Sequence, residues 1–251
     1  TIITIFIITF FRSFYQSLIK YTFFKLEITE LIDNKQKPQL AELSIDASTE
    51  LPYSDYTRTL DIDNAIHTVM YKENGITFKR EYFMSYPDNV MVMRLTSDSK
   101  KGKLSRIISL ESLHTDKTIT ADGHTITMTG YPTPVSGDKR VGDAWKNGLI
   151  YAQQLVVKNK GGKISVVDGT KLKVEDADEI IVLMSAATNY VQCMDDSYNY
   201  FSQEDPLEKV QATLRKVADK KYTALLATHQ KDYHSLYDRM RLNLGNLPEA
   251  P

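Results

Sequence analysis

The sequence predicts a mainly β protein, with an antiparallel sandwich or barrel over residues 53–203 and a helical segment over residues 204–251. Two-residue turn signals such as Asn74-Gly75 lie between short stretches of alternating apolar and polar residues, which is typical of β-hairpins. The chain also holds fifteen tyrosines and nine phenylalanines, and aromatic side chains suit a half-buried pleated surface. Near Asp205 the apolar spacing changes to the helical period, which marks the end of the sandwich.

Residues 1–52 are expected to form an irregular segment with short elements and incomplete strands. The segment opens with TIITIFIITFF, an apolar and β-branched run that is too short to cross a bilayer as a helix. It also lacks a basic n-region and a small-residue cleavage site. We therefore expect neither a targeting signal nor a membrane span here, but a buried strand if the fold covers the run and an aggregation-prone segment if it does not.

The first clear element is a hairpin in AIHTVMYKENGITFKREYFMS, whose tip is Asn74-Gly75. Asn-Gly supplies the positive φ angles of a type I′ turn, and a two-residue loop fixes the register of the two strands. The register predicts four cross-strand pairs: Glu73 with Ile76, Tyr71 with Phe78, Val69 with Arg80, and His67 with Tyr82. The last three pairs should share one face of the sheet.

Arg80 is therefore expected to lie among aromatic side chains. One interpretation is structural: the guanidinium stacks on rings and reaches an acid such as Asp61 or Asp63. The other interpretation is a ligand-binding arginine, which requires that face of the sheet to be open to solvent. The first is favoured because it needs no open face.

Further strands continue the same pattern along the chain. SYPDNVMVMRL turns at Pro87-Asp88 and enters a strand over residues 90–95. Later turns are expected at Asp122-Gly123, Gly161-Gly162 and Asp168-Gly169, and an apolar strand at residues 180–184. Short strands at regular spacing predict an antiparallel sandwich or barrel.

The helical segment begins at Asp205, a good N-cap, followed by Pro206, a good first helical residue. Apolar residues then recur at helical spacing: Leu207, Val210, Leu214, Val217, Ala218, Leu225 and Leu226. We expect one long helix to about Arg241, or two helices joined near Tyr222. Its apolar face should pack on the sheet or on a further part of a longer protein.

The composition speaks against a charged binding surface and against cofactor chemistry. Hydrophobic residues make up 42% of the chain and charged residues 25%, with a formal net charge of -1, so no basic field recruits nucleic acid. The single cysteine, Cys193, excludes an internal disulfide and is expected to be a buried structural thiol. No glycine-rich phosphate loop precedes a helix and no cysteine and histidine cluster is present, so we expect neither cofactor nor metal.

Two pairs of polar side chains are candidate sites. His229 and His234 are five apart on a helix, which points them in different directions, so packing is favoured over metal binding. Asp61 and Asp63 form a same-face carboxylate pair at strand spacing, which superficially suits glycoside hydrolysis. A pair that neutralises Arg80 or Arg58 is the favoured interpretation.

Trp145 is the one candidate substrate-binding residue. It lies in SGDKRVGDAWKNG, an irregular segment, and an exposed tryptophan among polar residues can stack on a sugar ring. A tryptophan that caps the core is the alternative. We expect no catalytic residue in the chain.

Five blocks of the chain resemble the N-terminal region of glycoside hydrolase family 95. They are YTRTLDIDNAIHTVMYKENGITFKREYFMSYPDNVMVMRL, GLIYAQQLVV, GGKISVVDGTKLKVEDADEIIVLMSAATNY, DP and HQKDYHSLYDRMRLNLG, in the family's order over residues 53–245. That family contains α-L-fucosidases and related α-L-galactosidases. The resemblance implies a galactose-mutarotase-like antiparallel β-supersandwich followed by a helical linker.

The resemblance also implies where the chemistry lies. In the family an (α/α)6 barrel after the linker carries the acid and the groups for an inverting hydrolysis. The chain is therefore expected to be a non-catalytic part of a longer enzyme, with the barrel in cis and a fucosylated oligosaccharide as substrate of the whole protein. A periplasmic or secreted location follows from the resemblance alone. The alternative is a free-standing carbohydrate-binding or interaction module, and self-association through exposed strands is a further hypothesis.

Overall fold

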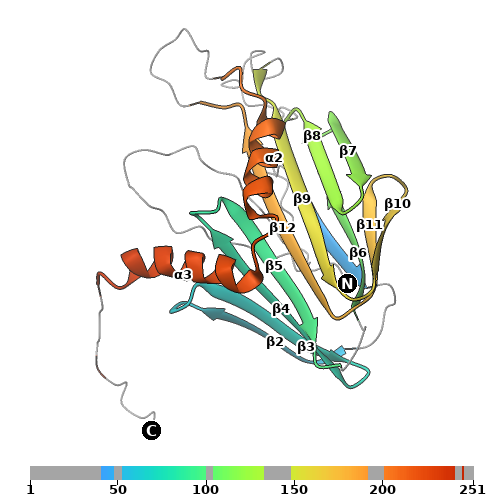
Figure 1. Cartoon of the computed structure of the whole chain (residues 1–251), viewed down its shortest axis with the longest axis vertical. Helices are drawn as coiled ribbons and strands as arrows, with labels where there is room; N and C mark the ends of the chain where they lie inside the picture. The colour runs from blue at the N-terminus through green and yellow to red at the C-terminus, as the bar shows by residue number, and fades with distance from the viewer. Residues whose placement is uncertain are drawn as a thin grey trace.

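The computed structural model describes residues 41–47, 53–99, 104–132, 148–191, 201–240 and 245, and it consists of two antiparallel sheets and two helices (Figure 1). The small sheet has the order β1-β6-β11-β10, and the large sheet has the order β2-β3-β4-β5-β12-β9-β8-β7. The predicted β-sandwich followed by a helical segment is confirmed. None of the described helices is long and apolar enough to cross a membrane.

The small sheet is built from β1 (Glu42–Ala47), β6 (Leu104–Glu111), β10 (Lys163–Val167) and β11 (Lys171–Ala177). The large sheet is built from β2 (Tyr53–Asp61), β3 (Ile66–Glu73), β4 (Ile76–Ser85), β5 (Val90–Ser97), β7 (Lys117–Asp122), β8 (Thr125–Gly130), β9 (Tyr151–Lys160) and β12 (Glu179–Thr188). β1 lies in the segment before residue 53, from which only short elements were expected. It belongs to the sandwich because Leu43 and Ile45 alternate into the core beside β6.

The β3–β4 hairpin has the predicted register. Asn74 and Gly75 form the turn with φ angles of 49° and 74°. All four expected pairs are present: Glu73 with Ile76, Tyr71 with Phe78, Val69 with Arg80, and His67 with Tyr82. The loop length therefore decided which side chains of β3 and β4 point into the sandwich.

The later turns are also where the sequence predicted them. Gly123 at the β7–β8 turn and Gly169 at the β10–β11 turn have φ angles of 54° and 66°. The Gly169 carbonyl accepts a hydrogen bond from the backbone amide of Ala121 at 2.7 Å, which joins the two sheets along the side where β7 lies. The expected apolar strand at residues 180–184 lies within β12.

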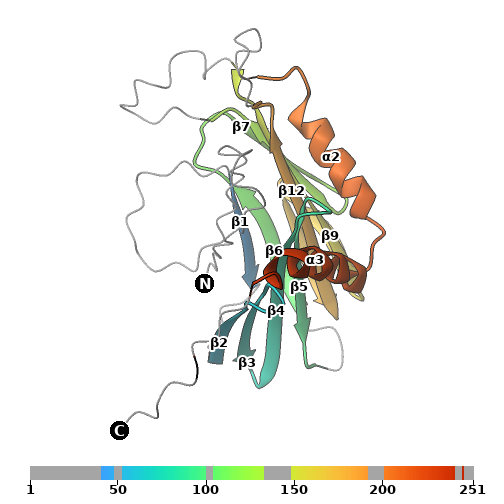
Figure 2. The same cartoon turned by 90° about the vertical axis from the view of Figure 1, so that its left-hand side faces the viewer.

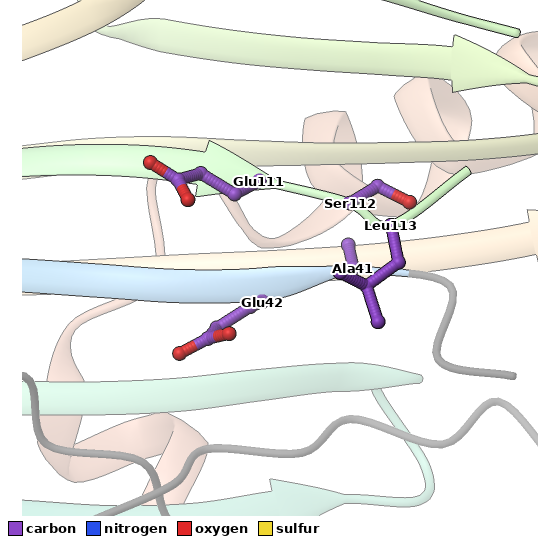
Figure 3. Close-up of a pocket in the computed structure, with 5 residues that line it drawn as sticks. All are labelled: Ala41, Glu42, Glu111, Ser112 and Leu113. Carbon is purple, nitrogen blue, oxygen red and sulfur yellow. The ribbon is translucent and has the colours of Figure 1, made fainter. Parts of the chain in front are cut away.

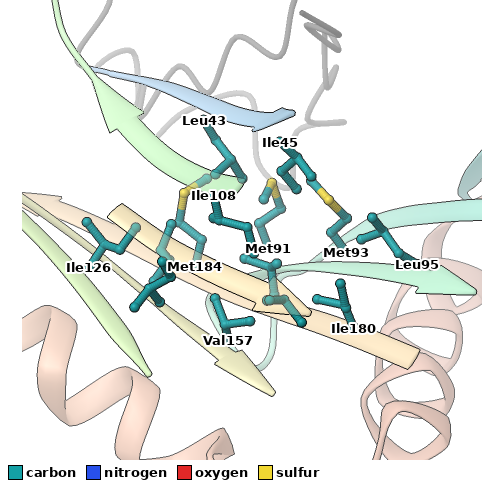
Figure 4. Packing of buried hydrophobic residues seen from close by; sticks show 14 of the residues in the cluster. Leu43, Ile45, Met91, Met93, Leu95, Ile108, Ile126, Val157, Ile180 and Met184 are labelled. Carbon is teal, nitrogen blue, oxygen red and sulfur yellow. The ribbon is translucent and has the colours of Figure 1, made fainter. Parts of the chain in front are cut away.

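The main core lies between the two sheets (Figure 4). Its buried members come from both sheets, and the larger ones are Leu43, Ile45, Tyr71, Phe78, Tyr82, Met91, Met93, Leu95, Leu104, Ile108, Leu110, Ile126, Met128, Tyr151, Leu155, Leu172, Ile180 and Met184. Methionines line the centre of the large sheet, and their flexible thioethers fill irregular space between branched side chains. Close packing between the sheets fixes how they stack.

Arg80 points into this core, and only 5% of its surface is exposed. Its Nη2 donates a hydrogen bond to the hydroxyl of Tyr71 at 3.0 Å, and its guanidinium carbon lies 5.3 Å from the centre of the Tyr71 ring. The expected stacking on aromatic rings is confirmed, and a solvent-open ligand site on this face is excluded. The expected contact with Asp61 or Asp63 is wrong, because Asp61 ends β2, Asp63 lies in the turn after it, and both accept hydrogen bonds from other groups.

Two helices follow the sandwich, α2 (Pro206–Val217) and α3 (Tyr222–Tyr237), and Figure 2 shows them on the face of the large sheet that points away from β1 and β6. The alternative of two helices joined near Tyr222 is therefore confirmed. Asp205 is the N-cap, with its Oδ1 accepting the amide of Leu207 at 2.8 Å, and Pro206 is the first helical residue.

Replacing Gly162 with Ala should lower the free energy of unfolding by more than replacing Gly169 with Ala. Both glycines have positive φ angles, 64° and 66°, so each alanine carries a similar backbone cost of about 1–2 kcal/mol. A Cβ on Gly162 would also lie 2.1 Å from the carbonyl oxygen of Glu175, whereas a Cβ on Gly169 would meet nothing within 4 Å. Urea denaturation measures both variants, and equal losses would contradict this close backbone approach.

Arg80→Ala should lower the free energy of unfolding by about 1–3 kcal/mol, because it removes buried packing and the hydrogen bond from Arg80 to the Tyr71 hydroxyl. Arg58→Ala is the matched control, since Arg58 is exposed on β2 and its loss should change stability by no more than about 0.5 kcal/mol. Urea denaturation of both variants provides the comparison. An Arg80→Ala variant with the same free energy of unfolding as the wild type would show that the buried arginine does not stabilise the fold.

Candidate functional site

The strongest candidate for a functional site is the outer face of the large sheet, where α2 and α3 dock. A second apolar cluster lies here, separate from the core between the sheets. Its buried members are Phe83, Val90, Val92, Ala152, Leu183, Val210, Leu214, Val217, Tyr222 and Leu225. The two helices are therefore held on the sandwich by a core of their own, which we call the docking core.

α2 packs along β9 and β12 through the apolar stripe that the sequence predicted. Val210, Leu214 and Val217 are its buried apolar residues, and they are spaced by four and three positions. Spacing of this kind puts side chains on one side of a helix. The opposite side of α2 carries charged residues such as Arg215, which is exposed.

The connection between the helices is fixed by lysine contacts. Lys158, on β9, donates hydrogen bonds to the backbone carbonyls of Ala218 and Lys220, the latter at 3.1 Å. These carbonyls follow the last turn of α2, where acceptors lack helical partners and a cation is favoured. Lys220 in turn pairs with Asp88, of the β4–β5 turn, with Nζ 2.6 Å from Oδ1. Burial lowers the pKa of Lys158.

The start of α3 is held by Arg94, on β5. Its Nε donates to Oε2 of Glu179 at 2.6 Å, and its Nη1 lies 3.5 Å from Oε2 of Glu81. The guanidinium carbon lies 4.7 Å from the centre of the Tyr222 ring, the first residue of α3. Burial raises the pKa of the Tyr222 hydroxyl, so the ring stays neutral against the cation. Arg94 therefore links three strands to the helix.

The rest of α3 lies against β4 and the β2–β3 turn. The His229 ring stacks on Phe83 with centres 4.9 Å apart, and its Nε2 lies 3.0 Å from the carbonyl oxygen of Ala65. The Tyr233 hydroxyl donates to the carbonyl of Ile62 at 2.6 Å. α3 is thus bonded to a turn that is nearly 170 positions earlier in the chain.

Asp61 and Asp63 do not form the same-face carboxylate pair that strand spacing predicted. Asp61 ends β2 and accepts hydrogen bonds from the amide and side chain of Asn64 at 3.0 and 2.8 Å, and the side-chain bond is the main reason its pKa is lowered. Asp63 lies in the turn and accepts from the Tyr237 hydroxyl at 3.0 Å. The expected pairing with Arg58 or Arg80 is therefore wrong, because the strand ends before residue 63.

The histidines behave as packing residues in the described part of the chain. His229 is buried against Phe83 of the docking core, whereas His234 points to Asp238 with 3.0 Å between Nδ1 and Oδ2. No group of three or more metal-binding side chains occurs among the residues that the structure describes. Trp145 and Cys193 lie outside the described residues, so both stay sequence expectations.

A small pocket lies at the junction of β1 with the end of β6, lined by Ala41, Glu42, Glu111, Ser112 and Leu113 (Figure 3). Glu42 and Glu111 are register partners, so two carboxylates lie beside each other here. The volume is about 60 Å³. Ligand pockets have volumes of roughly 300–1,000 Å³, so this one has room for ordered water and not for a sugar ring.

Sequence reasoning missed the polar contacts that hold the two helices beside the docking core. The positions of Lys158, Asp88 and Arg94 depend on pairing between strands that are far apart in sequence. No local sequence pattern predicts this strand pairing. Arg94 interrupts the apolar run VMVMRL, and that interruption was the one available signal. The apolar contacts were visible as the helical stripe of α2.

Comparison with known proteins adds the family. The family described as glycosyl hydrolase family 65, N-terminal domain, matches residues 22–193. "Probable alpha-fucosidase A" of Aspergillus niger is 29% identical over 210 residues, which are 82% of this chain and 25% of that protein. "Alpha-L-fucosidase 2" of Arabidopsis thaliana is 32% identical over 206 residues, which are 76% of this chain and 24% of that protein. The chain thus spans about a quarter of the length of these relatives.

These similarities confirm the expected likeness to the N-terminal region of a fucosidase-like glycoside hydrolase. The family model that matches is that of family 65, whereas the sequence blocks resemble family 95. The likeness to fucosidases rests on the two named relatives. Because the match covers well over half of the residues, the chain belongs to the family of glycosyl hydrolase family 65 N-terminal domains.

Proposed function

We propose that the chain is the non-catalytic sandwich and helical linker of a fucosidase-like glycoside hydrolase. The whole protein would hydrolyse α-L-fucosyl or α-L-galactosyl glycans with a catalytic barrel domain in cis. The names of the relatives support the substrate class, and their length supports a further domain, because this chain matches only 24–28% of each of them. The role of the sandwich is to support and orient that domain.

The docked helix pair is the observation that carries this proposal. α2 and α3 do not extend freely from the sandwich, because the docking core and the contacts of Lys158 and Arg94 fix them to the large sheet. A helix fixed in this way transmits the orientation of the sheet to whatever the chain builds after it. Lys158 contacts the chain just after α2, and Arg94 contacts the first residue of α3. Two contacts on either side of the bend restrict rotation of the helix pair on the sheet as well as its separation from the sheet.

The carboxylates of the described residues support a non-catalytic role. Inverting hydrolysis needs a general acid whose pKa is raised, and a second group about 6.5–9.5 Å away that activates water. Hydrogen bonds instead lower the pKa of Asp61, Asp98 and Glu175. Glu81 and Glu179 are engaged by Arg94. All five carboxylates are thus engaged in structural contacts.

The purified chain should release no fucose from aryl α-L-fucosides or fucosylated oligosaccharides at any pH, because the proposal places the catalytic groups in the barrel domain. A coupled fucose assay measures this directly. Asp61→Asn and Asp63→Asn serve as controls. Turnover that persists through purification and disappears in either variant would contradict the proposal.

Isothermal titration with fucosylated oligosaccharides tests the alternative of a free-standing carbohydrate-binding module. The proposal predicts no saturable heat from the chain alone, since the described pocket is too small for a sugar ring. Tight binding would favour the module instead. The activity assay and the titration therefore separate the three outcomes of inert support, enzyme and binding module.

The attachment of α3 should weaken as the pH falls below about 6.5, because burial lowers the pKa of His229 from its usual value of 6.5. The backbone carbonyls of Ala65 and Met84 and the charge of Asp232 only partly offset this effect. As the pH falls, His229 is protonated in the unfolded chain before it is protonated in the folded chain. The contribution of His229 to the free energy of unfolding is therefore complete above pH 6.5, and it decreases as the pH falls from 6.5 to the lowered pKa of the folded state.

His229→Phe keeps a ring against Phe83 and removes the titrating group, so the variant should lose less stability than wild type between pH 7 and about pH 5. Urea denaturation at several pH values measures both proteins. His67 and His114 also have pKa values lowered by burial, so part of the pH dependence should remain in the variant. Identical profiles for the two proteins would contradict a role of His229 in holding α3.

A further inference from the structure

Two buried arginines from opposite sheets meet at one hydroxyl group. Arg80 lies on β4 of the large sheet and Arg106 on β6 of the small sheet, with 5% and 4% of their surfaces exposed. Their Nη2 atoms lie 3.0 and 3.1 Å from the same oxygen, the hydroxyl of Tyr71. The two positive charges are therefore only a few ångströms apart in the interior of the sandwich.

The hydrogen-bond donors of this cluster outnumber its acceptors. A guanidinium has five N–H donors, whereas the hydroxyl acceptors are Tyr71, which both arginines share, and Tyr82, which bonds Arg80. Arg106 donates in addition to the Ser105 carbonyl at 2.8 Å. The buried Nε atoms of both Arg80 and Arg106 have no hydrogen-bond acceptor among the described residues. A buried unsatisfied donor costs about 1–3 kcal/mol, and more when it is charged.

The charges of the cluster do not balance either. Glu73 is the one described carboxylate that pairs with it, and its Oε2 lies 4.0 Å from Nη2 of Arg106. Burial raises the pKa of Tyr82 to about 12, so that neighbouring hydroxyl stays neutral at physiological pH. The faces of Tyr71 and Phe78 offer only partial compensation, at 5.3 and 5.1 Å from the two guanidinium carbons. Two cations therefore share one distant carboxylate.

We propose that this arginine pair binds a small inorganic anion, of the size and charge of chloride, between the two sheets. An anion there would accept hydrogen bonds from the unsatisfied Nε–H groups and would neutralise the second positive charge. The ligand must be small because both side chains are more than nine-tenths buried. The site is independent of the docking core and does not rest on the proposed function.

The test is denaturant unfolding of the 251-residue chain, with sodium gluconate replaced by sodium chloride at constant ionic strength. An anion that binds only the folded protein stabilises it by RT ln(1 + [L]/Kd), so the free energy of unfolding should rise along a saturating curve. Broadening of the chloride-35 NMR signal by the folded protein should give the same Kd. A linear dependence on chloride, or no dependence together with no broadening, would overturn the proposal.

Three variants make the test specific. Arg106→Met keeps much of the buried volume and should weaken chloride binding about tenfold or more, because it removes a charged donor. Arg215→Met changes an exposed arginine on α2 and should leave the chloride curve unchanged. Glu73→Gln should tighten binding, because it removes the competing negative charge, and it provides a measurement if Arg106→Met does not fold. A chloride curve in Arg106→Met or in Glu73→Gln that equals that of the wild type would contradict the site.

Discussion

The structure depends on the burial of β5, β9 and β12 on both faces. Successive residues of these strands point to opposite sides of the large sheet, so Met91 and Met93 enter the core between the sheets while Val90 and Val92 enter the docking core. Leu183 joins the docking core in the same way on β12. Each core needs this shared layer, and the small sheet and the helix pair are both attached through it.

The docking core is a better guide to function than any single side chain. Apolar packing supplies adhesion between the helices and the sheet, but it has little directional preference. Lys158 and Arg94 add direction, because the first contacts the carbonyls after α2 and the second contacts the first ring of α3. A linker that is fixed at its bend in this way suits a sandwich that orients a following domain, which is the proposed role of the chain.

Local patterns in the sequence predicted much of the fold but little of the candidate site. Asn74-Gly75 fixed four cross-strand pairs because a two-residue loop leaves no freedom in the register. Asp205-Pro206 located the start of α2 because a cap and a proline act on the adjacent turn. The Arg94–Glu179 contact needs β5 beside β12, more than 80 positions apart, and Asp61 and Asp63 were misjudged because the end of β2 has no local signal.

Native-state hydrogen exchange tests most directly whether the helices are an integral part of the sandwich. If the docking core holds them, the most protected amides of α2 and of the first turns of α3 should open with the same free energy as those of β9 and β12. Protection in α3 should be strongest near Leu225 and His229, which are buried, because the first amides of the helix have no intrahelical acceptor. Rapid exchange throughout α2 and α3, with β9 and β12 still protected, would show that the helices are not held by the sheet.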